Sequence, residues 1–543
     1  MKQLTQLIVL LITTLQLSAQ LAVTIPGEFE KKESLILTWS NQQELNLVTT
    51  RIISNVQHQI DTVWVLYQTA PVTIDTAAIH QFLLSNGATM VHVQFLEVQY
   101  QSPWIGNYGP ITGFAAFEND LERFIFNPGY AWNESPEDDS IPARLADIWN
   151  WPVADMGLQL NAGNLLHDAI KRGFSTKKVL GMNPQLTEAE IKARLIEKYN
   201  LSDWVFLDTL AHSGGGPNKN LDMMMKVLDF ETLLVSEYPD TLPDYQVVEQ
   251  NVSILQSLTD AFGVHYTIFR IPAPPRADGT FGASPEDEMR TYTNSLILNH
   301  QIIIPSFGLP WYDSVATAVY QEAMPGYQII SVDASAISPL NQGIHNLTNS
   351  LPQGHYLRIE HRKIIGQQAF QADFQITCMS KAGDLVEEMW LYYKLNADTV
   401  YQKTPVYLVC PEHFGVIHGL SETDTVHYYL ESISSATTTR YPLSAPSGNF
   451  TFWFDVISGV EAPDDVNSFA VYPNPGNGEF EVTFPDDISH AKLLLYHLNG
   501  KIILEKSVKN HQKIDVRSEL SPGIYLLRLK SSDQDETIKL LIR

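Results

Sequence analysis

The sequence predicts an α/β protein followed by two all-β parts. Short apolar strands such as TVWVLY (62–67) and QIIIPSFG (301–308) alternate with helical stretches such as LTEAEIKARLIEKYN (186–200), which is the pattern of an α/β fold. From about Arg362 the helical pattern stops, and alternating aromatic segments separated by turns take its place. The last part, from Phe469, combines strand patterns with Pro-Asn-Gly turn signals, which predicts a small all-β unit.

Residues 1–19 have the layout of a secretory signal peptide. Lys2 precedes an apolar run from Leu7 to Leu17, and Ser18 and Ala19 supply small residues near a cleavage site. A membrane anchor is the alternative, but it needs about 20 apolar residues and this run is shorter. No later segment is long and apolar enough for a transmembrane helix, so we expect an exported protein that is not transmembrane.

Composition and charge restrict the classes of partner. The chain has 543 residues, of which 44% are hydrophobic, so we expect about two to four domains with substantial cores. Its 35 basic and 61 acidic residues give a net charge of −26. A charge of this sign repels nucleic acid and anionic membranes, and neither is an expected partner.

The domain boundaries follow changes in pattern. We expect an α/β domain at 20–361 and an immunoglobulin-like β-sandwich at 362–457, because FQADFQITC, MWLYYKL, TVHYYLESI and NFTFWFDVI alternate and are separated by turn residues. The segment SGVEAPDDVNS (458–468) is poor in apolar residues and is predicted to be a linker. A third, all-β domain then covers 469–543.

The two cysteines, Cys378 and Cys410, both fall in the predicted sandwich. Each ends a strand whose alternate residues are apolar, so both thiols are expected to face one interior, with Val406 and Leu408 inward in the second strand. A disulfide, worth about 3–4 kcal/mol in an oxidising compartment, and two buried free thiols both fit this pattern. Neither cysteine is expected to be catalytic.

The C-terminal part resembles the sorting domains of the type IX secretion system of Bacteroidetes. The resemblance rests on Tyr472-Pro473-Asn474-Pro475, on Asn499-Gly500-Lys501 and on Ser521-Pro522-Gly523-Ile524-Tyr525. It implies that the type IX secretion machinery is a partner. It also implies passage through the periplasm and outer membrane to a secreted or surface-attached location.

The α/β region resembles the agmatine deiminases and bacterial peptidylarginine deiminases, which have the pentein fold. The resemblance implies five pseudo-repeated units in a five-fold pseudo-symmetric propeller around one site, hydrolysis of a guanidino group, and no cofactor. The segments that carry it are IPGEFEKKESLILTWS (25–40), PWIGNYGP (103–110), NAGNLLHD (161–168), NLDMMMKVLDFETLLVSEY (220–238), RTYTNSLILNHQIIIPSFG (290–308), AVYQEAMPGYQIISVD (318–333) and GIHNLT (343–348).

Three positions depart from the pattern of these deiminases. Deimination needs a thiolate nucleophile, a titratable acid/base and carboxylates that hold the guanidinium. The family's Trp-x-Arg-Asp motif has Gly106 and Asn107 in place of its arginine and aspartate. Its His-x-Asp motif has Asn220 in place of the histidine and keeps Asp222, and its His-Cys motif has Asn346 in place of the nucleophilic cysteine. The sequence therefore predicts that deiminase activity is lost.

The resemblance also marks positions that would bind a substrate: Trp104, Asn107, Asn164, Asp222 and Asn294. No metal is expected, because no His/Cys cluster has zinc spacing. The acidic stretch NESPEDDS (133–140) lacks the spacing of an EF-hand and is predicted to be a solvated loop.

Three functions stay open on the sequence. The first is an inactive deiminase relative that binds a neutral ureido compound or a peptide, because three ionisable groups have become neutral amides. The second is an active peptidylarginine or agmatine deiminase, which in the agmatine case would belong to putrescine biosynthesis. The third is a structural or adhesive module at the cell surface.

Overall fold

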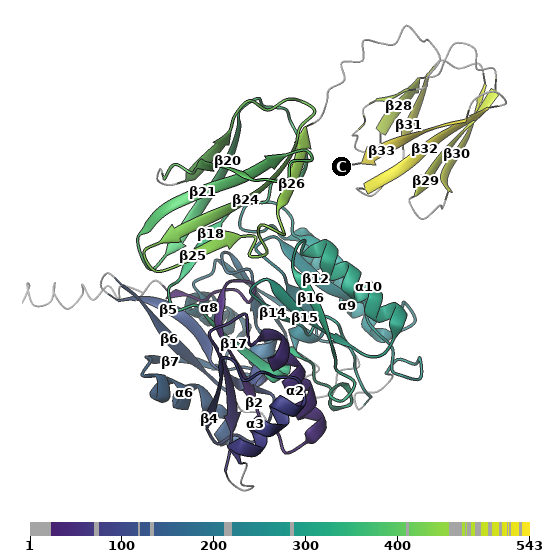
Figure 1. The fold of residues 1–543 in the computed structure, drawn as a ribbon. Coiled ribbons are helices and arrows are strands. Elements are labelled where there is room, and N and C mark those ends of the chain that lie inside the picture. Colours follow the sequence, from purple (N-terminus) through teal and green to yellow (C-terminus); the bar gives the residue numbers. More distant parts are fainter. Residues whose placement is uncertain are drawn as a thin grey trace, which may run out of the picture. The chain divides into compact units, whose positions relative to one another are not determined.

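The computed structural model describes most of the chain (Figure 1). The described residues are 23–69, 75–117, 120–130, 135–210, 220–282, 287–408, 412–454 and, further on, the strands between 470 and 542 with Asn474 and Leu520. The predicted signal peptide and the linker at 458–468 lie outside them. The chain divides into two compact units between Asp455 and Val456, and each is treated separately.

Five small mixed sheets form the α/β region of the first unit, counted over its described residues. Their orders are β17-β2-β3-β4, β1-β5-β6-β7, β10-β9-β8, β11-β12-β13 and β14-β15-β16. The strands are β1 (Val23–Thr24), β2 (Lys32–Thr38), β3 (Thr62–Tyr67), β4 (Val93–Glu97), β5 (Ile111–Phe117), β6 (Asp120–Gly129), β7 (Val153–Gln159), β8 (Leu166–His167), β9 (Arg172–Thr176), β10 (Asp203–Leu207), β11 (Met225–Val227), β12 (Thr232–Glu237), β13 (Thr267–Pro272), β14 (Leu296–Leu298), β15 (Gln301–Ser306), β16 (Gln328–Asp333) and β17 (Thr348–Pro352).

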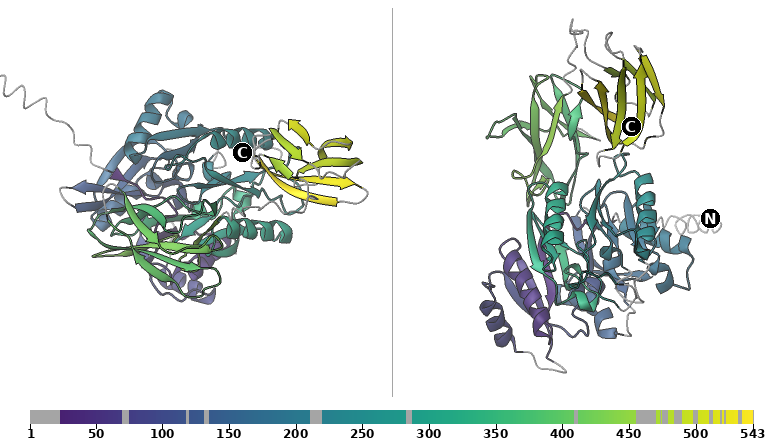
Figure 2. Two further views of the ribbon diagram at one scale, coloured as in Figure 1. Left: turned by 90° about the horizontal axis from the view of Figure 1, so that it is seen from above. Right: turned by 90° about the vertical axis from the view of Figure 1, so that its right-hand side faces the viewer.

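The five sheets share one internal topology. In each, an antiparallel pair is extended by a strand that runs parallel to its neighbour, as in β11-β12-β13 and β14-β15-β16. Helices make the crossovers, as parallel pairing requires, and they lie around the outside of this region (Figures 1 and 2). The longer helices are α2 (Gln43–Val56), α3 (Thr76–Ser85), α6 (Ile141–Trp149), α8 (Glu188–Tyr199), α9 (Pro243–Ser257) and α10 (Pro310–Ala323), and the short ones are α4 (Ile105–Tyr108), α5 (Pro136–Asp139) and α7 (Lys178–Met182).

Local sequence accounts for several of these elements. The predicted strand 62–67 is β3, and the predicted helix in 186–200 is α8, which starts at a capping box between Thr187 and Glu190. The acidic stretch 133–140 was predicted wrongly as a solvated loop. It contains α5, and Asp138 is 1% exposed because its carboxylate accepts the backbone N–H groups of Gln101 and Ser102.

Two β-sheets follow within the same unit. Their orders are β18-β20-β23 and β19-β26-β24-β21-β22, with β25 on β24. They share an aromatic core in which the rings of Phe374 and Phe452 lie 4.5 Å apart. The strands are β18 (Leu357–Glu360), β19 (Gly366–Gln368), β20 (Phe374–Ala382), β21 (Val386–Leu395), β22 (Gln402–Pro405), β23 (His413–Ile417), β24 (Thr425–Ser434), β25 (Thr438–Tyr441) and β26 (Phe450–Phe454).

Only one of the two cysteines lies in the described part of the chain. Cys378 alternates inward with Phe374 and Ile376 on β20, and burial raises the pKa of its thiol to about 12. The second predicted strand is wrong at Leu408, which is 43% exposed because β22 ends at Pro405. Cys410 lies outside the described residues, so a bridge to Cys378 stays a prediction.

The second unit is all-β in its described residues. It contains the sheets β27-β28-β31 and β30-β29-β32-β33, and β29 pairs antiparallel with β30 across the predicted Asn499-Gly500 turn. Its core contains Phe480, Leu493 and Leu527. The strands are β27 (Ala470–Tyr472), β28 (Glu479–Thr483), β29 (His490–His497), β30 (Ile502–Lys509), β31 (Lys513–Arg517), β32 (Gly523–Ser531) and β33 (Asp535–Ile542).

Candidate functional site

Short segments ahead of five strands bring the predicted site residues together. α4 precedes β5, and the one-turn helices η2 (Ala162–Asn164), η4 (Leu221–Met223) and η6 (His345–Leu347) precede β8, β11 and β17. Asn294 lies in a bend ahead of β14. Each of these strands belongs to the antiparallel pair of a different sheet. The repeated topology therefore places one polar segment of each sheet in one neighbourhood.

The three asparagines at the altered positions form one buried hydrogen-bonded cluster. Asn107, Asn220 and Asn346 are each at most 1% exposed. Asn346 Nδ2 donates to Asn107 Oδ1 at 3.1 Å, and Asn220 Nδ2 reaches the same oxygen at 3.4 Å. Asn107 in turn donates to Gln342 Oε1 at 3.5 Å. We name these three side chains the amide cluster.

Further contacts fix the orientation of the amide cluster. Asn220 donates to Asn161 Oδ1 at 2.9 Å and accepts from Lys178 Nζ at 2.7 Å, while Asn346 Oδ1 accepts the backbone N–H of Gly343 at 2.8 Å. The sequence patterns did not single out Asn161 or Lys178. Asn161 could have been found inside NAGNLLHD, whereas no motif marks Lys178, which comes from α7.

Asp222 and His345 are the ionisable groups beside the cluster. Asp222 is fully buried, and its Oδ2 lies 2.9 Å from His345 Nδ1 and 3.4 Å from Asn346 Nδ2. Its Oδ1 has no hydrogen-bond partner among the described residues. A buried carboxylate oxygen without a partner is costly.

Glu28 completes a carboxylate–imidazole–carboxylate chain. Its Oε2 lies 3.5 Å from His345 Nε2, and its Oε1 pairs with the buried Lys226 ammonium at 2.5 Å. Burial opposes ionisation of Glu28, but Lys226 and His345 outweigh it and lower the pKa of this carboxyl. His345 therefore lies between two carboxylates, Asp222 and Glu28.

The other predicted substrate-binding residues serve as ties between elements. Asn164 Oδ1 accepts from both the backbone N–H and the hydroxyl of Thr176 and from the N–H of Leu221, at 2.9–3.0 Å. Asn294 Oδ1 accepts the N–H of His345 at 2.8 Å. Trp104 is half-buried, and its carbonyl accepts the N–H of Asn107 at the start of α4.

Two glycines allow the close approach of backbone around the site. A Cβ on Gly106 would lie 2.2 Å from the His345 carbonyl oxygen and 2.9 Å from Asn346 Cα. A Cβ on Gly163 would lie 2.6 Å from Asp222 Oδ2. α4 thus packs backbone to backbone against η6. The backbone of the segment that carries Asn346 occupies the space that a side chain at position 106 would need.

A small polar cavity of about 130 Å³ adjoins Gly106 and His345. Glu28, Lys32 and His167 also line it. Burial lowers the pKa of Lys32 to about 8, and burial with the nearby Lys32 charge lowers the pKa of His167 to about 3, so His167 is neutral. The cavity has room for several water molecules.

The geometry defines which chemistry the site can perform. The side chains of Asn346 and Asn220 are amides, which do not titrate near neutral pH and are poor nucleophiles. Asp222 Oδ2 and His345 Nδ1 lie 2.9 Å apart. In the part of the chain that the structure covers, no group of three or more His, Cys, Asp or Glu side chains is placed to hold a metal ion.

The C-terminal unit indicates where the protein is located. Residues 470–543 match the secretion system C-terminal sorting domain, a type IX secretion signal, so the protein is secreted or attached to the cell surface. Among the described helices, none has the length and apolar character needed to cross a membrane.

Solved structures establish the fold of the α/β region. The agmatine deiminase of Enterococcus faecalis aligns with 61% of this chain and 96% of its own chain, with a TM-score of 0.52 at 18% identity. A variant of the agmatine deiminase of C. jejuni with substrate bound gives a TM-score of 0.52 at 16% identity, over 61% of this chain and 97% of its own. The α/β region therefore has the pentein-like fold of agmatine and peptidylarginine deiminases.

Sequence comparison gives the same relationship. The agmatine deiminase of Medicago truncatula is 23% identical over 294 residues, which cover 48% of this chain and 79% of the relative. Residues 24–352, more than half of the chain, match the Porphyromonas-type peptidyl-arginine deiminase. The chain belongs to that family.

Proposed function

We propose that this protein is a secreted member of the deiminase family that does not hydrolyse guanidino groups. One observation carries the proposal: at the family position of the nucleophile, the Asn346 side chain is fully buried and its Nδ2 is committed to Asn107 and Asp222. An amide nitrogen of this kind is a poor nucleophile. No covalent intermediate can form on it.

The charge of the site supports the same conclusion. A guanidinium stays cationic at ordinary pH and needs carboxylates to hold it. Asn107 stands where the family has an aspartate, and Asp222 already interacts with His345. The site therefore attracts a cation less than the site of an active deiminase would. Family membership by itself does not decide the activity.

The direct test is an assay of the purified protein with agmatine and with a peptidyl-arginine substrate. We expect no citrulline, N-carbamoylputrescine or ammonia. Release of any of them at a rate that depends on enzyme concentration would refute the proposal and establish the active deiminase. The triple variant Asn107→Asp, Asn220→His, Asn346→Cys, assayed in parallel, shows whether the chemistry alone was lost.

We propose further that a ligand of this site is neutral and carries a ureido group, as citrulline does. Amides supply both donors and acceptors to such a group, and Asp222 Oδ1, which has no partner among the described residues, could accept a ureido N–H if the buried site opens to a ligand. Calorimetry should show citrulline binding more tightly than arginine. Absence of citrulline binding, or tighter binding of arginine, would contradict the neutral-ligand proposal without restoring the active deiminase.

A structural role at the cell surface is the second candidate. It is favoured by the hydrogen bonds that the amides make with one another and with Asn161, Lys178 and Gly343, because these bonds leave the cluster satisfied without a ligand. This candidate predicts neither turnover nor citrulline binding, together with loss of stability when Asn346 is removed.

Finer points of architecture are part of the same proposal. These are a five-fold pseudo-symmetric propeller, an immunoglobulin-like topology at 362–457, cleavage after residue 19 and a domain boundary near 361. The common topology of the five sheets supports the first. For the boundary near 361, β18 (Leu357–Glu360) pairs with β20 of the following sheets. This pairing supports a boundary a few residues earlier, ahead of Leu357.

A further inference from the structure

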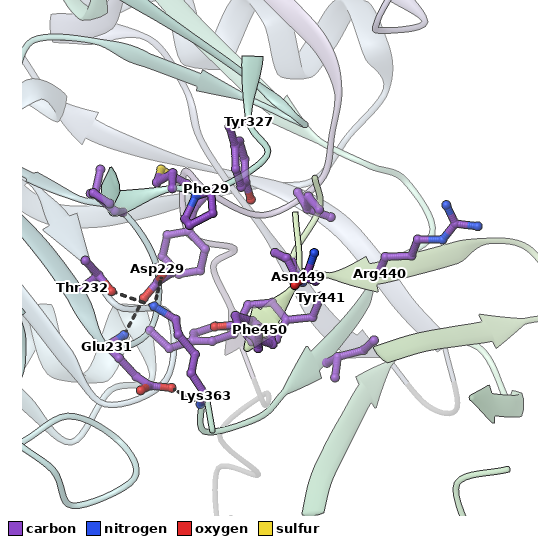
Figure 3. Close-up of a pocket in the computed structure, with 18 of the residues that line it drawn as sticks. Phe29, Asp229, Glu231, Thr232, Tyr327, Lys363, Arg440, Tyr441, Asn449 and Phe450 are labelled. Carbon is purple, nitrogen blue, oxygen red and sulfur yellow. Dashed lines mark hydrogen bonds and ion pairs between the residues drawn. The ribbon is translucent and has the colours of Figure 1, made fainter. Parts of the chain in front are cut away.

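A pocket of about 410 Å³ lies between the α/β sheets and the β-sandwich of the first unit (Figure 3). The α/β side contributes the turn from Leu228 to Thr232 and the end of α10, and the sandwich side contributes β18, β25 and the start of β26. We name it the junction pocket. Its volume suits a small organic ligand, and none of the altered deiminase positions lines it.

Aromatic rings from both sides form a continuous wall. Phe230 lies 5.1 Å from Phe29 and 5.4 Å from Tyr441, and Tyr441 lies 5.1 Å from Phe450, measured between ring centroids. All four rings line the junction pocket. Such a wall buries apolar surface of a ligand, and the ring faces attract a cation.

Two carboxylates that line the junction pocket have no ion pair among the described residues, the half-buried Glu231 and the exposed Glu322. Lys363 pairs with Asp229, Arg358 with Glu360 and Arg440 with Glu431, while Lys31 Nζ donates to a backbone carbonyl. Glu231 accepts the backbone N–H of Lys363 at 2.8 Å. Among the described residues it has no cation within ion-pair distance. In Figure 3 Asp229, Glu231, Thr232 and Lys363 gather on one side of the pocket, and Arg440 lies across it.

A buried hydroxyl in the lining of the same pocket also lacks a partner among the described residues. Tyr441 is 9% exposed, and its hydroxyl has no hydrogen-bond partner among the residues that the structure describes. Burial raises the pKa of the Tyr441 hydroxyl, and the negative charges of Asp229 and Glu231 raise it further. An unpaired buried hydroxyl is destabilising, and a ligand atom that hydrogen-bonds to it would remove this penalty.

We propose that the junction pocket binds an organic cation, an amine with an aromatic or aliphatic body. Its ammonium pairs with Glu231 and donates a hydrogen bond to the Tyr441 hydroxyl. Its body lies against the aromatic wall. A neutral ligand would leave the Glu231 carboxylate without a partner, and an acid would meet an unpaired charge of its own sign.

The state of Glu231 without a ligand agrees with this assignment. Burial raises its pKa to about 7, although Lys363 acts in the opposite direction. An ammonium group in contact with Glu231 would favour the ionised carboxylate. It would offset the loss of hydration that burial causes.

The test compares three probes built on one phenylethyl scaffold by calorimetry on the full chain at about pH 8. These are 2-phenylethylamine, the neutral 2-phenylethanol and the anionic 3-phenylpropionate. We expect the amine to bind at least tenfold more tightly than the alcohol, and the acid to bind most weakly. Glu231→Gln should bring the ratio of amine to alcohol close to one, and Tyr441→Phe should weaken the amine several-fold.

Glu322→Gln is the matched control, because Glu322 lines the same pocket but is exposed at the end of α10, where solvent screens its charge. It should leave all three affinities unchanged. Equal affinities for amine and alcohol, a preference for the amine that survives Glu231→Gln, or no saturable binding of the amine would each overturn the proposal. Thermal unfolding of every variant shows that it is folded.

Discussion

Replacing Gly106 by alanine should open the contact between α4 and η6. The new Cβ would lie 2.2 Å from the His345 carbonyl oxygen and 2.8 Å from that of Thr348. Both atoms are backbone, so no side chain can rotate away. The two segments must separate by about 1 Å or more to restore ordinary van der Waals distance, and the hydrogen bond from Asn346 to Asn107, now 3.1 Å, would break.

The cost follows from these changes. Forcing an extra methyl group into a packed site costs about 1–3 kcal/mol. Leaving a buried amide unpaired adds about 1–3 kcal/mol, and the better helix propensity of alanine returns about 0.5–1 kcal/mol. We therefore expect a net loss of about 2–4 kcal/mol, which lowers the melting temperature by roughly 2–4 °C in a unit of this size.

Differential scanning calorimetry measures this loss, with Gly181→Ala as the control. Gly181 lies in α7, and a Cβ there would meet nothing within 4 Å. That variant should be neutral or slightly stabilised. If the Gly106→Ala and Gly181→Ala variants have the same melting temperature, then α4 and η6 are not packed as described. The closed site that supports lost deimination would then be refuted.

Three further predictions concern other parts of the chain. Asn346→Ala should cost about 2–4 kcal/mol, because it removes a buried donor and an acceptor at once; a change below about 0.5 kcal/mol in thermal unfolding would contradict the amide cluster. The pKa of Glu231 is raised from 4.5 to about 7 on folding, so wild-type stability should fall as pH rises through that window. Glu231→Gln should remove up to about 3 kcal/mol of this fall, and superimposable pH profiles would show that Glu231 is not buried as described. Truncation after Asp455 should leave the melting temperature of the first unit within about 1–2 °C, since the two units are separately compact; a larger drop would mean that they stabilise each other.

The motifs mark the altered positions, because each lies in a segment with a recognisable pattern; the role of these residues in binding stays a prediction. Asn107, Asn220 and Asn346 come from three distant motifs, and the structure joins them in one cluster. The meaning of Gly106 was not accessible from the motif. There it indicates only a lost arginine, and the structure adds that the backbone of η6 occupies the space of any side chain.

The junction pocket was not predictable from the sequence. Glu231, Tyr327, Lys363 and Tyr441 lie on four segments that no local pattern relates, and only the packing of two sets of sheets brings them to one pocket. The error at Leu408 has a similar origin. Alternation predicts a strand correctly only where a partner strand exists, and β22 ends three residues earlier, at Pro405.

The pairing of β17 with β2 determines when the α/β region can be completed. Thr348 pairs with Leu37, so the first long strand of the region receives this neighbour from its last strand. During synthesis, which starts at the N-terminus, β2 therefore keeps one edge unpaired until nearly the whole region has been made. Contacts of such long sequence separation form slowly, and an open edge can pair with other chains meanwhile. We therefore expect this architecture to expose the chain to aggregation while it folds.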